Sequence, residues 1–506
     1  MAKLVDLPAE LLDIVLSDLA GDGNKMLKRV CLVGNRKLTQ IARRLSFRHI
    51  RIALKFPLSE RHPFYRRFRG ILDNPSLCAS VRTVQFACEG HQDSIKLSQF
   101  LNKNLGRLSN VTHAYLVCNS EDACWLGCIS RIILLSLITI PSLRHLSIRG
   151  CQCLCDDYFP ISSSTAELDT LTLEDVKLES RGSSDGWASI LRSVSGVKTL
   201  NMKNCRWSTD GDTSGCLSAA IVLKELQMAG ATAWSSIRKL HVGCSCEPCQ
   251  WYCQADARQL AKLCECELPH LEELAVISRS SEVFACTTTT MQDIGNAFGA
   301  SLKRLWLSFP QCQCFTPNEL LNAAPKFREL EELAIQDQGT NTAYASAFSQ
   351  FQFLTNIHFL PPMRNPPRRL TAKNARDMAA VLVKNNAVLQ NISWQSSDIT
   401  IQIREGDPVI YDDAPPPPVL RNSVCIKKES SDNGLEEPQA EVEGAAQASG
   451  SAQPVNRDVK EEDVEAEDGK DMLLKRSITS HSYCLPAWLD AEWLQYETRE
   501  LLAPGP

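Results

Sequence analysis

The chain has 506 residues, of which 44% are apolar, and its formal net charge at pH 7 is −5. This length predicts two or three domains with sizeable cores. The small net charge argues against a basic surface that would recruit nucleic acid or a membrane, so we expect neither as a partner.

Charged and turn-forming residues interrupt the first twenty positions, so these do not form the apolar stretch of a signal peptide. The apolar run 132–140 is much shorter than the ~20 residues that cross a bilayer. We therefore expect a soluble protein of the cytoplasm, the nucleus or both. In those compartments the 22 cysteines are expected to be reduced thiols, core fillers or metal ligands.

The first fifty residues predict a compact block of helices. Pro8 and Glu10 suit a first helical turn, because Pro lacks an N–H that is unpaired there and Glu faces the positive end of the helix dipole. On a helical wheel of residues 8–19, the apolar side chains cover an arc of roughly 200°, about twice what a core-covering helix needs. Fifty residues hold too little chain to cover the excess, so we expect a partner protein to do so.

Apolar residues recur in three groups within this block. They are Leu7, Pro8, Leu11, Leu12 and Ile14, then Leu27, Val30, Cys31, Leu32 and Val33, then Leu38, Ile41, Ala42, Leu45, Phe47 and Ile50. With this pattern, residues 4–50 resemble an F-box, and residues 1–52 are assigned to it. The third helix departs from many F-boxes, which carry an aromatic residue near Lys37.

The resemblance implies that a Skp-type adaptor binds this block and connects it to a cullin. By residue match, the adaptor contacts are Leu7, Pro8, Leu11, Ile14, Leu16, Leu32 and Val33. The alternative is an ordinary three-helix cap on a larger domain.

Basic and aromatic residues alternate at 61–69, within a predicted helical connector at 53–78. We expect the aromatic side chains to pack inward and the arginines to be solvated, which would fix the first block to the domain that follows. Binding of RNA or an anionic surface is the alternative.

An apolar-x-x-apolar-x-apolar phrase recurs through residues 79–403. The copies are Val81-Val84-Phe86, Val111-Ala114-Leu116, Leu143-Leu146-Ile148, Leu168-Leu171-Leu173, Val197-Leu200-Met202, Leu223-Leu226-Met228, Ile237-Leu240-Val242, Leu271-Leu274-Val276, Leu302-Leu305-Leu307, Leu330-Leu333-Ile335, Leu354-Ile357-Phe359 and Leu389-Ile392-Trp394. A dozen copies in phase predict a solenoid. Their spacing of about 24–35 residues overlaps and exceeds the range of leucine-rich repeats.

The phrase resembles a divergent leucine-rich repeat, which implies an α/β solenoid with parallel strands on the concave side and helices on the convex side. Helix candidates lie at 187–191 and 255–261. Asn119, Cys151 and Cys205 occupy the offset at which that family places Asn or Cys to bond the backbone amides of the turn. The step from Leu223 to Ile237 is too short for a full unit, so one of those two copies is expected to be false.

Residues 404–480 predict a disordered linker. A run of four prolines at 415–418 predicts a stiff extended spacer, and the acidic stretch 427–471 has no aromatic residue with which to build a core. Lys427 and Lys460 lie in aliphatic-Lys-x-Glu phrases that resemble acceptor sites for the modifier SUMO, although such short patterns also arise by chance.

The C-terminal segment 481–506 returns to helical spacing, with Leu485, Leu489, Trp493 and Tyr496 on one face. We expect this segment to cap the end of the solenoid, since terminal repeats need a cover. Binding of a partner is the alternative.

The densest group of metal-ligand residues is Cys244, Cys246, Cys249 and Cys253. Four thiolates can hold zinc tetrahedrally, but a paired C-x-x-C frame is absent, so a reduced loop between repeats is the preferred interpretation and we expect no cofactor. Neither a phosphate-binding glycine loop nor a nucleophile elbow is present, so we expect no active site.

An F-box joined to leucine-rich repeats resembles the substrate receptors of SCF-type cullin-RING ubiquitin ligases, and the irregular repeats have the character of fungal members. The resemblance implies a receptor that is not itself an enzyme and that holds an unidentified protein substrate close to the ubiquitin-charged enzyme. One alternative is an interaction scaffold that binds the adaptor without ubiquitylation. Another is a repeat protein that binds RNA or metal.

Overall fold

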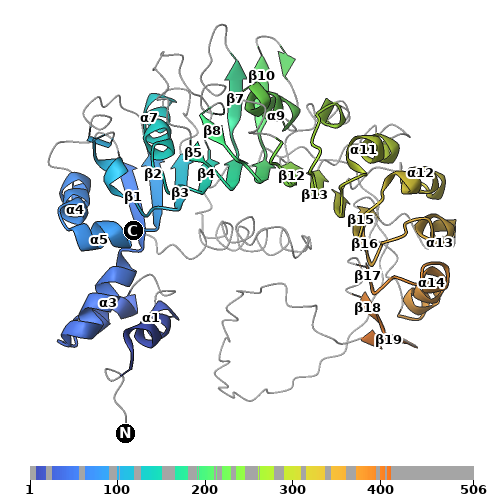
Figure 1. Ribbon diagram of the computed structural model, residues 1–506, viewed down its shortest axis with the longest axis horizontal. Coiled ribbons are helices and arrows are strands. Elements are labelled where there is room, and N and C mark those ends of the chain that lie inside the picture. The colour runs from blue at the N-terminus through green and yellow to red at the C-terminus, as the bar shows by residue number, and fades with distance from the viewer. Residues whose placement is uncertain are drawn as a thin grey trace, which may run out of the picture. The chain divides into compact units, whose positions relative to one another are not determined.

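The repeated apolar phrase forms the strands of one curved sheet (Figure 1). The structure is a computed structural model, and it describes residues 7–18, 25–55, 63–89, 100–101, 103–118, 127–150, 166–180, 191, 193–209, 212–213, 219–228, 235–244, 260, 262–278, 290–308, 315–336, 343–360, 372–394, 399–404 and 407–411. All of them belong to a unit of residues 1–413, whereas residues 414–506 form a second unit outside the described part of the chain.

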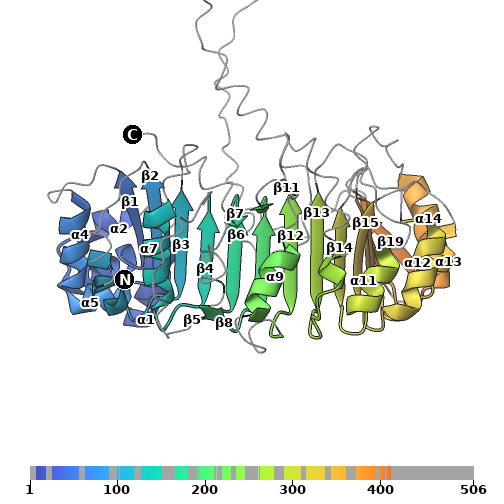
Figure 2. The same ribbon diagram turned by 90° about the horizontal axis from the view of Figure 1, so that it is seen from above.

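Among the described residues, twelve neighbouring strands of a 14-stranded sheet are parallel and the last two are antiparallel (Figure 2). In sheet order they are β1 (His49–Lys55), β2 (Thr83–Glu89), β3 (His113–Cys118), β4 (His145–Arg149), β6 (Thr170–Glu174), β9 (Thr199–Lys203), β12 (Lys239–Cys244), β13 (Glu273–Ser278), β14 (Arg304–Ser308), β15 (Glu332–Gln336), β16 (Asn356–Leu360), β17 (Asn391–Trp394), β18 (Ile399–Arg404) and β19 (Asp407–Tyr411). The chain therefore continues in the sheet beyond the predicted end at 403.

Helices cover the convex side of the sheet, and the strands line its concave side (Figure 1). The described helices of this layer are α4 (Pro63–Leu72), α5 (Pro75–Ser80), η3 (Leu105–Arg107), α7 (Gly127–Ile138), α9 (Ala219–Met228), α11 (Thr290–Phe298), α12 (Pro317–Ala323), η6 (Ala324–Lys326), α13 (Ala343–Phe348) and α14 (Ala372–Asn385). Two small sheets accompany them, one of β5 (Ala166–Glu167) and β8 (Val194–Ser195), the other of β7 (Lys177–Ser180), β10 (Arg206–Thr209) and β11 (Asp212–Thr213).

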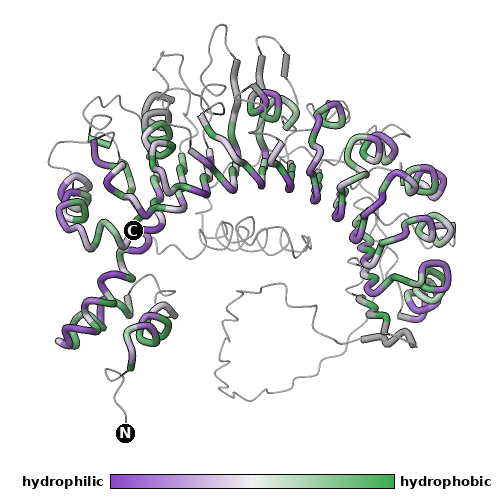
Figure 3. Tube along the Cα trace, in the orientation of Figure 1, coloured by the Kyte–Doolittle hydropathy of each residue, from purple (hydrophilic) through white to green (hydrophobic). Residues whose placement is uncertain are grey.

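Apolar side chains of the phrase point from the strands toward the helices and join one continuous core. Apolar and polar residues alternate along the strands, because successive side chains of a strand point to opposite faces (Figure 3). The α/β solenoid with a long parallel sheet is therefore confirmed, and it is consistent with a leucine-rich-repeat-like architecture.

Eleven of the twelve predicted copies of the phrase lie at these strands. The exception is Leu223-Leu226-Met228, which lies in α9, so this copy is the false one of the close pair. An apolar i, i+3, i+5 pattern also fits a buried helix, in which Leu223 and Leu226 face the sheet. The predicted helix candidates lie outside the described residues except for Leu191 and Leu260.

The first strand, β1, covers residues that the sequence pattern places in the first block (to 52) and in the helical connector (from 53). It pairs in parallel with β2 along its full length, so the sheet begins at His49 and not at 79. Within the connector, α4 buries Phe68, and the Tyr65 ring packs edge-on against Phe100 at 5.2 Å between centroids. The inward packing of the aromatic side chains is thus confirmed for these two residues.

Three short helices precede the sheet: α1 (Ala9–Asp18), α2 (Lys25–Cys31) and α3 (Arg36–Ser46). They form a core of their own, which we call the three-helix unit, around Leu12, Leu16 and Leu27 together with the buried face of α3. Asn35 caps α3 by accepting the Leu38 N–H at 3.1 Å.

The turns between helix and strand stack by side-chain hydrogen bonds from one repeat to the previous one. The hydroxyls of Ser142, Ser236 and Ser301 each donate to a backbone carbonyl of the preceding turn, at 2.7, 2.9 and 2.9 Å. Each serine directly precedes the first apolar residue of its phrase. The serines therefore help to fix the position of each new strand, along the strand direction, relative to the preceding repeat.

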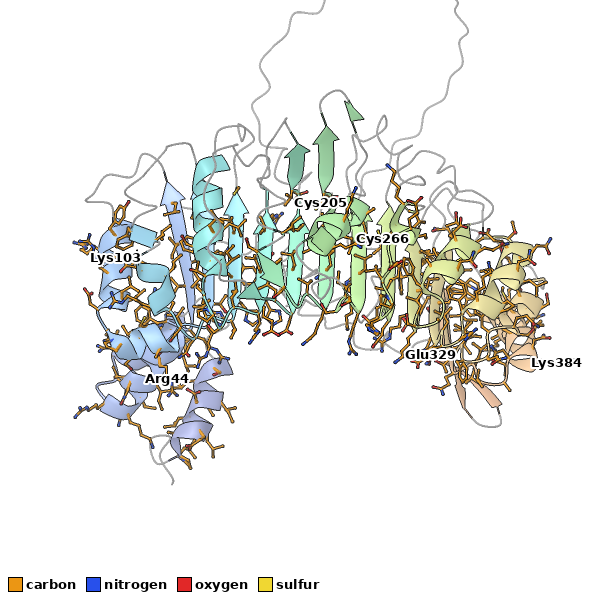
Figure 4. All side chains as sticks on the ribbon, turned by 45° about the horizontal axis from the view of Figure 1, so that its top comes forward. Arg44, Lys103, Cys205, Cys266, Glu329 and Lys384 are labelled. Atoms are coloured by element: carbon orange, nitrogen blue, oxygen red, sulfur yellow. The ribbon has the colours of Figure 1, made fainter. Side chains whose placement is uncertain are left out.

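Where strands end, residues in the left-handed region turn the chain away from the sheet. Gly150, Asp175 and Asn204 have φ of 70°, 51° and 53°, and a Cβ at Gly150 would collide with the Cys118 carbonyl. The buried Cys205 thiol donates to the Leu173 carbonyl at 3.3 Å, and burial raises the pKa of this thiol to about 12 (Figure 4). The bond of Cys205 thus reaches a carbonyl, whereas its offset predicted bonds to backbone amides of the turn, and Asn119 and Cys151 lie outside the described residues.

No helix in the described part of the chain is long and apolar enough to span a membrane.

Glu319 lies in the first turn of α12 and links two neighbouring helices. Its Oε1 accepts the Met291 N–H in the first turn of α11 at 3.0 Å, although the residue is buried. Burial raises the pKa of this carboxyl to about 7 against the effect of that hydrogen bond, and the charge of Asp293 adds to the increase.

We expect the melting temperature of the Glu319→Gln variant to fall less with rising pH than that of the unchanged protein. Because the folded-state pKa of about 7 lies above the ordinary 4.5, the stabilisation is complete below pH 4.5 and is lost as the pH rises through about 7. Gln keeps a carbonyl oxygen for the Met291 N–H and does not titrate. Melting temperatures measured from pH 5 to 8.5 test this, and parallel curves for the two proteins would contradict it.

Candidate functional site

Exposed apolar side chains gather on the three-helix unit. Among the described residues, eight large apolar side chains are exposed, and five of them lie within the first 33 positions. Their exposed fractions are 47% for Leu11, 61% for Ile14, 40% for Val15, 85% for Leu32 and 66% for Val33. We call these five residues the N-terminal apolar face.

The apolar face comes from α1 and from the turn between α2 and α3. On α1, Leu12 and Leu16 point into the core of the unit, so Leu11, Ile14 and Val15 are left on the opposite side. The Lys37 ammonium donates to the Leu7 carbonyl at 2.7 Å. This bond joins the beginning of α1 to the beginning of α3, directly after the turn.

Of the seven predicted adaptor contacts, the structure leaves Pro8, Leu11, Ile14, Leu32 and Val33 exposed. Leu7 is half-buried against the core. Leu16 is buried with 1% of its surface exposed, so its assignment as a contact is corrected: it follows Leu12 by four residues and shares its inward face. Val15 belongs to the exposed face and was missed, although its i+4 spacing from Leu11 indicates it.

A row of alternating charges crosses the concave face of the sheet. Glu273 on β13 accepts from Arg304 on β14 at 2.7 Å and lies 3.1 Å from the Lys239 ammonium on β12. On the other side of Arg304, Glu332 lies 3.8 Å from its guanidinium and 3.2 Å from the His358 ring. Because the strands are in register, residues more than a hundred positions apart join one network.

A second row lies next to it and is uncharged. Asn201, His241, Ala275, Trp306 and Ala334 occupy the same register position on five consecutive strands, and we call them the central concave patch. Each exposes 3% of its surface or less, yet none belongs to the core between sheet and helices.

His241 is the buried titratable group of this patch. Burial, aided by the charge of Lys239, lowers the pKa of the ring to about 3, so the imidazole is neutral. Its Nδ1 lies 2.8 Å from the Asn201 Oδ1, and the Asn201 amide donates to Thr172 at 3.2 Å, so Nδ1 carries the proton. The 3.9 Å separation between His241 and Glu273 is then no ion pair.

Of the four predicted zinc ligands, the structure describes Cys244 alone. Cys244 ends β12, while Cys246, Cys249 and Cys253 lie outside the described residues. Downstream, burial raises the pKa of the Cys264 thiol to about 12, so this thiol is a poor nucleophile at neutral pH. The part of the chain that the structure describes contains no cluster of three His, Cys, Asp or Glu residues able to hold a metal ion.

The predicted modification sites, Lys427 and Lys460, and the aromatic C-terminal segment also lie outside the described residues.

No protein-family model matches the sequence, and no curated protein matches it. Among solved structures, the chain is similar to the leucine-rich repeat-containing protein LegL7 from Legionella pneumophila. The TM-score is 0.32 at 12% identity, over 66% of this chain and 98% of that one. The assignment as a solenoid rests on the register of the sheet itself.

We expect the buried His241 to make the protein less stable in mild acid. Because its folded-state pKa of about 3 lies below the ordinary 6.5, its contribution is complete above pH 6.5 and is lost as the pH falls. The loss reaches about 2 kcal/mol at pH 5, at 1.36 kcal/mol per pH unit. His241→Gln removes this titration, so its free energy of unfolding should change less between pH 7.5 and 5; an unchanged pH dependence would exclude His241 as the cause.

Proposed function

We propose that this protein is the substrate-recognition subunit of an SCF-type ubiquitin ligase. In this proposal the three-helix unit binds a Skp-type adaptor and, through it, a cullin, while the solenoid binds the protein to be ubiquitylated. The observation that carries the proposal is the N-terminal apolar face, with its resemblance to the adaptor-binding surface of an F-box.

The energetics of this face favour a protein partner. Fully burying one Leu, Ile or Val side chain contributes roughly 1.5–3 kcal/mol, so burial of these five side chains together can supply most of the free energy of a specific interface. Clusters of exposed apolar side chains on a soluble protein typically mark such interfaces.

An ordinary cap would direct its apolar side chains toward the repeat array. Here the junction with the array uses other residues: Phe47, at the end of α3, and Ile50, in β1, pack against the large core. The apolar face belongs instead to α1 and the α2–α3 turn. This separation supports an external partner over a cap.

The receptor would accelerate ubiquitylation by proximity. It raises the effective concentration of a substrate lysine near the charged conjugating enzyme and needs no reactive group of its own. The solenoid offers the row of alternating charges on its concave face, from Lys239 to Glu332, as a surface for such a substrate.

We expect the double variant Leu11→Glu/Ile14→Glu to lose the adaptor. Both side chains are about half exposed or more, so the carboxylates are tolerated in the free protein but are expensive to bury at an interface. Affinity purification of the tagged full-length chain from cells, followed by mass spectrometry, should recover Skp-type adaptor and cullin with the unchanged chain. The double variant should lose both at equal expression.

Leu321→Glu and Phe353→Glu are matched controls, because they place the same charge on exposed apolar residues of the solenoid, at 40% and 55% exposure. Both should retain the adaptor. Recovery of adaptor without cullin would favour the non-ligase scaffold, and absence of adaptor from the unchanged chain would refute the assignment.

A further inference from the structure

The first four strands of the sheet share a concave surface of hydrogen-bond donors without a carboxylate. At their first two concave register positions lie His49, Thr83, His113 and His145, then Arg51, Gln85, Tyr115 and Ser147. His49 and Arg51 are exposed and the other six are half-buried, in contrast to the buried central concave patch. Side chains of all these types can donate a hydrogen bond. We call these eight residues the N-terminal concave surface.

Positive charge concentrates at this end of the sheet. Residues 25–55, which span α2, α3 and β1, contain ten Lys or Arg and neither Asp nor Glu. The net charge of −5 for the whole chain hides this local excess. Two exposed arginines, Arg48 and Arg82, directly precede β1 and β2. They are neighbours, because the Arg48 carbonyl accepts the Arg82 N–H at 2.9 Å.

These arginines lack the carboxylates that accompany the cations at the same position in three later repeats. Directly before β4, β9 and β12, Arg144 lies 2.9 Å from Glu167, Lys198 lies 2.7 Å from Asp169, and Arg238 lies 3.0 Å from Glu272. In the part of the chain that the structure describes, no carboxylate pairs with Arg48, Arg51 or Arg82. Like charges on neighbouring strands destabilise the fold, so this arrangement favours an anionic partner.

We propose that the N-terminal concave surface, with Arg48 and Arg82 at its border, binds an acidic segment of another protein. Guanidinium groups bind carboxylates through paired hydrogen bonds, and the hydroxyl, amide and imidazole donors beside them suit the remaining oxygens of such a segment. In the row of alternating charges, by contrast, the cations already face carboxylates. The binding itself does not depend on the adaptor; only the step that this ligand is the substrate rests on the proposed function.

The size of the surface suits a short extended segment. Four strands span three inter-strand spacings, or about 14 Å, which an extended chain crosses with about four residues at about 3.4 Å each. Arg82 is already oriented, because its guanidinium donates to the Asn110 carbonyl at 3.2 Å. A nucleic acid is less suited, since the three unpaired guanidinium groups would neutralise only about three phosphates, and the affinity for nucleic acid depends on that number.

Binding of a fluorescent peptide to the full-length chain tests the proposal. The probe is a peptide of about twelve residues in which Glu and Ser alternate, and the control peptide has Gln in place of Glu. In fluorescence anisotropy we expect the Glu peptide to bind, with an affinity that falls as NaCl is raised from about 50 to about 300 mM, and the Gln peptide not to bind. Arg48→Glu/Arg51→Glu should weaken binding of the Glu peptide about tenfold or more.

Arg328→Glu/Lys384→Glu is the matched control, because it makes the same change of charge at exposed cations of later repeats, with Lys384 near the far end of the sheet (Figure 4). It should bind the Glu peptide as the unchanged chain does. Arg48→Gln/Arg51→Gln removes the two charges without reversing them and should show a smaller loss, with an unchanged melting temperature. Arg48→Glu/Arg51→Glu should still recover the adaptor from cells, so peptide and adaptor binding are tested separately.

Absence of binding by the Glu peptide, equal binding of the two peptides, or an equal loss in the matched control would overturn the proposal. Tighter binding of an RNA of about twelve nucleotides than of the Glu peptide would overturn it in favour of a nucleic-acid site.

Discussion

The register of the whole sheet depends on the hydrogen bonds that place the start of each strand beside the previous repeat. Before a strand begins, one carbonyl of the preceding repeat accepts two successive N–H groups: the Arg48 carbonyl accepts those of Arg82 and Thr83 at 2.9 and 3.0 Å, and the Glu331 carbonyl accepts those of Thr355 and Asn356 at 2.8 and 3.0 Å. This constraint removes any slip between repeats. A slip of one residue would turn every apolar side chain toward the concave face, so register and core stabilise each other.

The same constraint explains how much of the fold could be predicted. A phrase with two inward apolar positions is required in every strand, and it is visible without knowledge of the loops between copies. The errors arose where that local signal is ambiguous. Leu223 and Leu226 satisfy the phrase from a helix, because buried helices and strands share short apolar spacings. The first strand shows clear alternation from His49 to Lys55, but Ile50 was counted with the apolar residues of the helical block before it.

The surfaces were predictable to different degrees. An apolar arc wider than a core requires is a property of one helix, so the exposed side of α1 could be expected; which of its residues face inward could not, because that depends on packing against α3. The central concave patch has no such local signature. His241 and Asn201 are 40 residues apart, and the irregular repeat lengths hide their common register until the strands are paired.

The way the three-helix unit is attached bears on the proposed role. Proximity catalysis depends on a fixed separation between the bound adaptor and the bound substrate, since a loose joint dilutes the effective concentration. Only two residues separate α3 from β1, and Phe47 lies between them with its ring against the large core. Helix α3, against which the rest of the three-helix unit packs, therefore leads directly into the sheet that carries the row of alternating charges on its concave face.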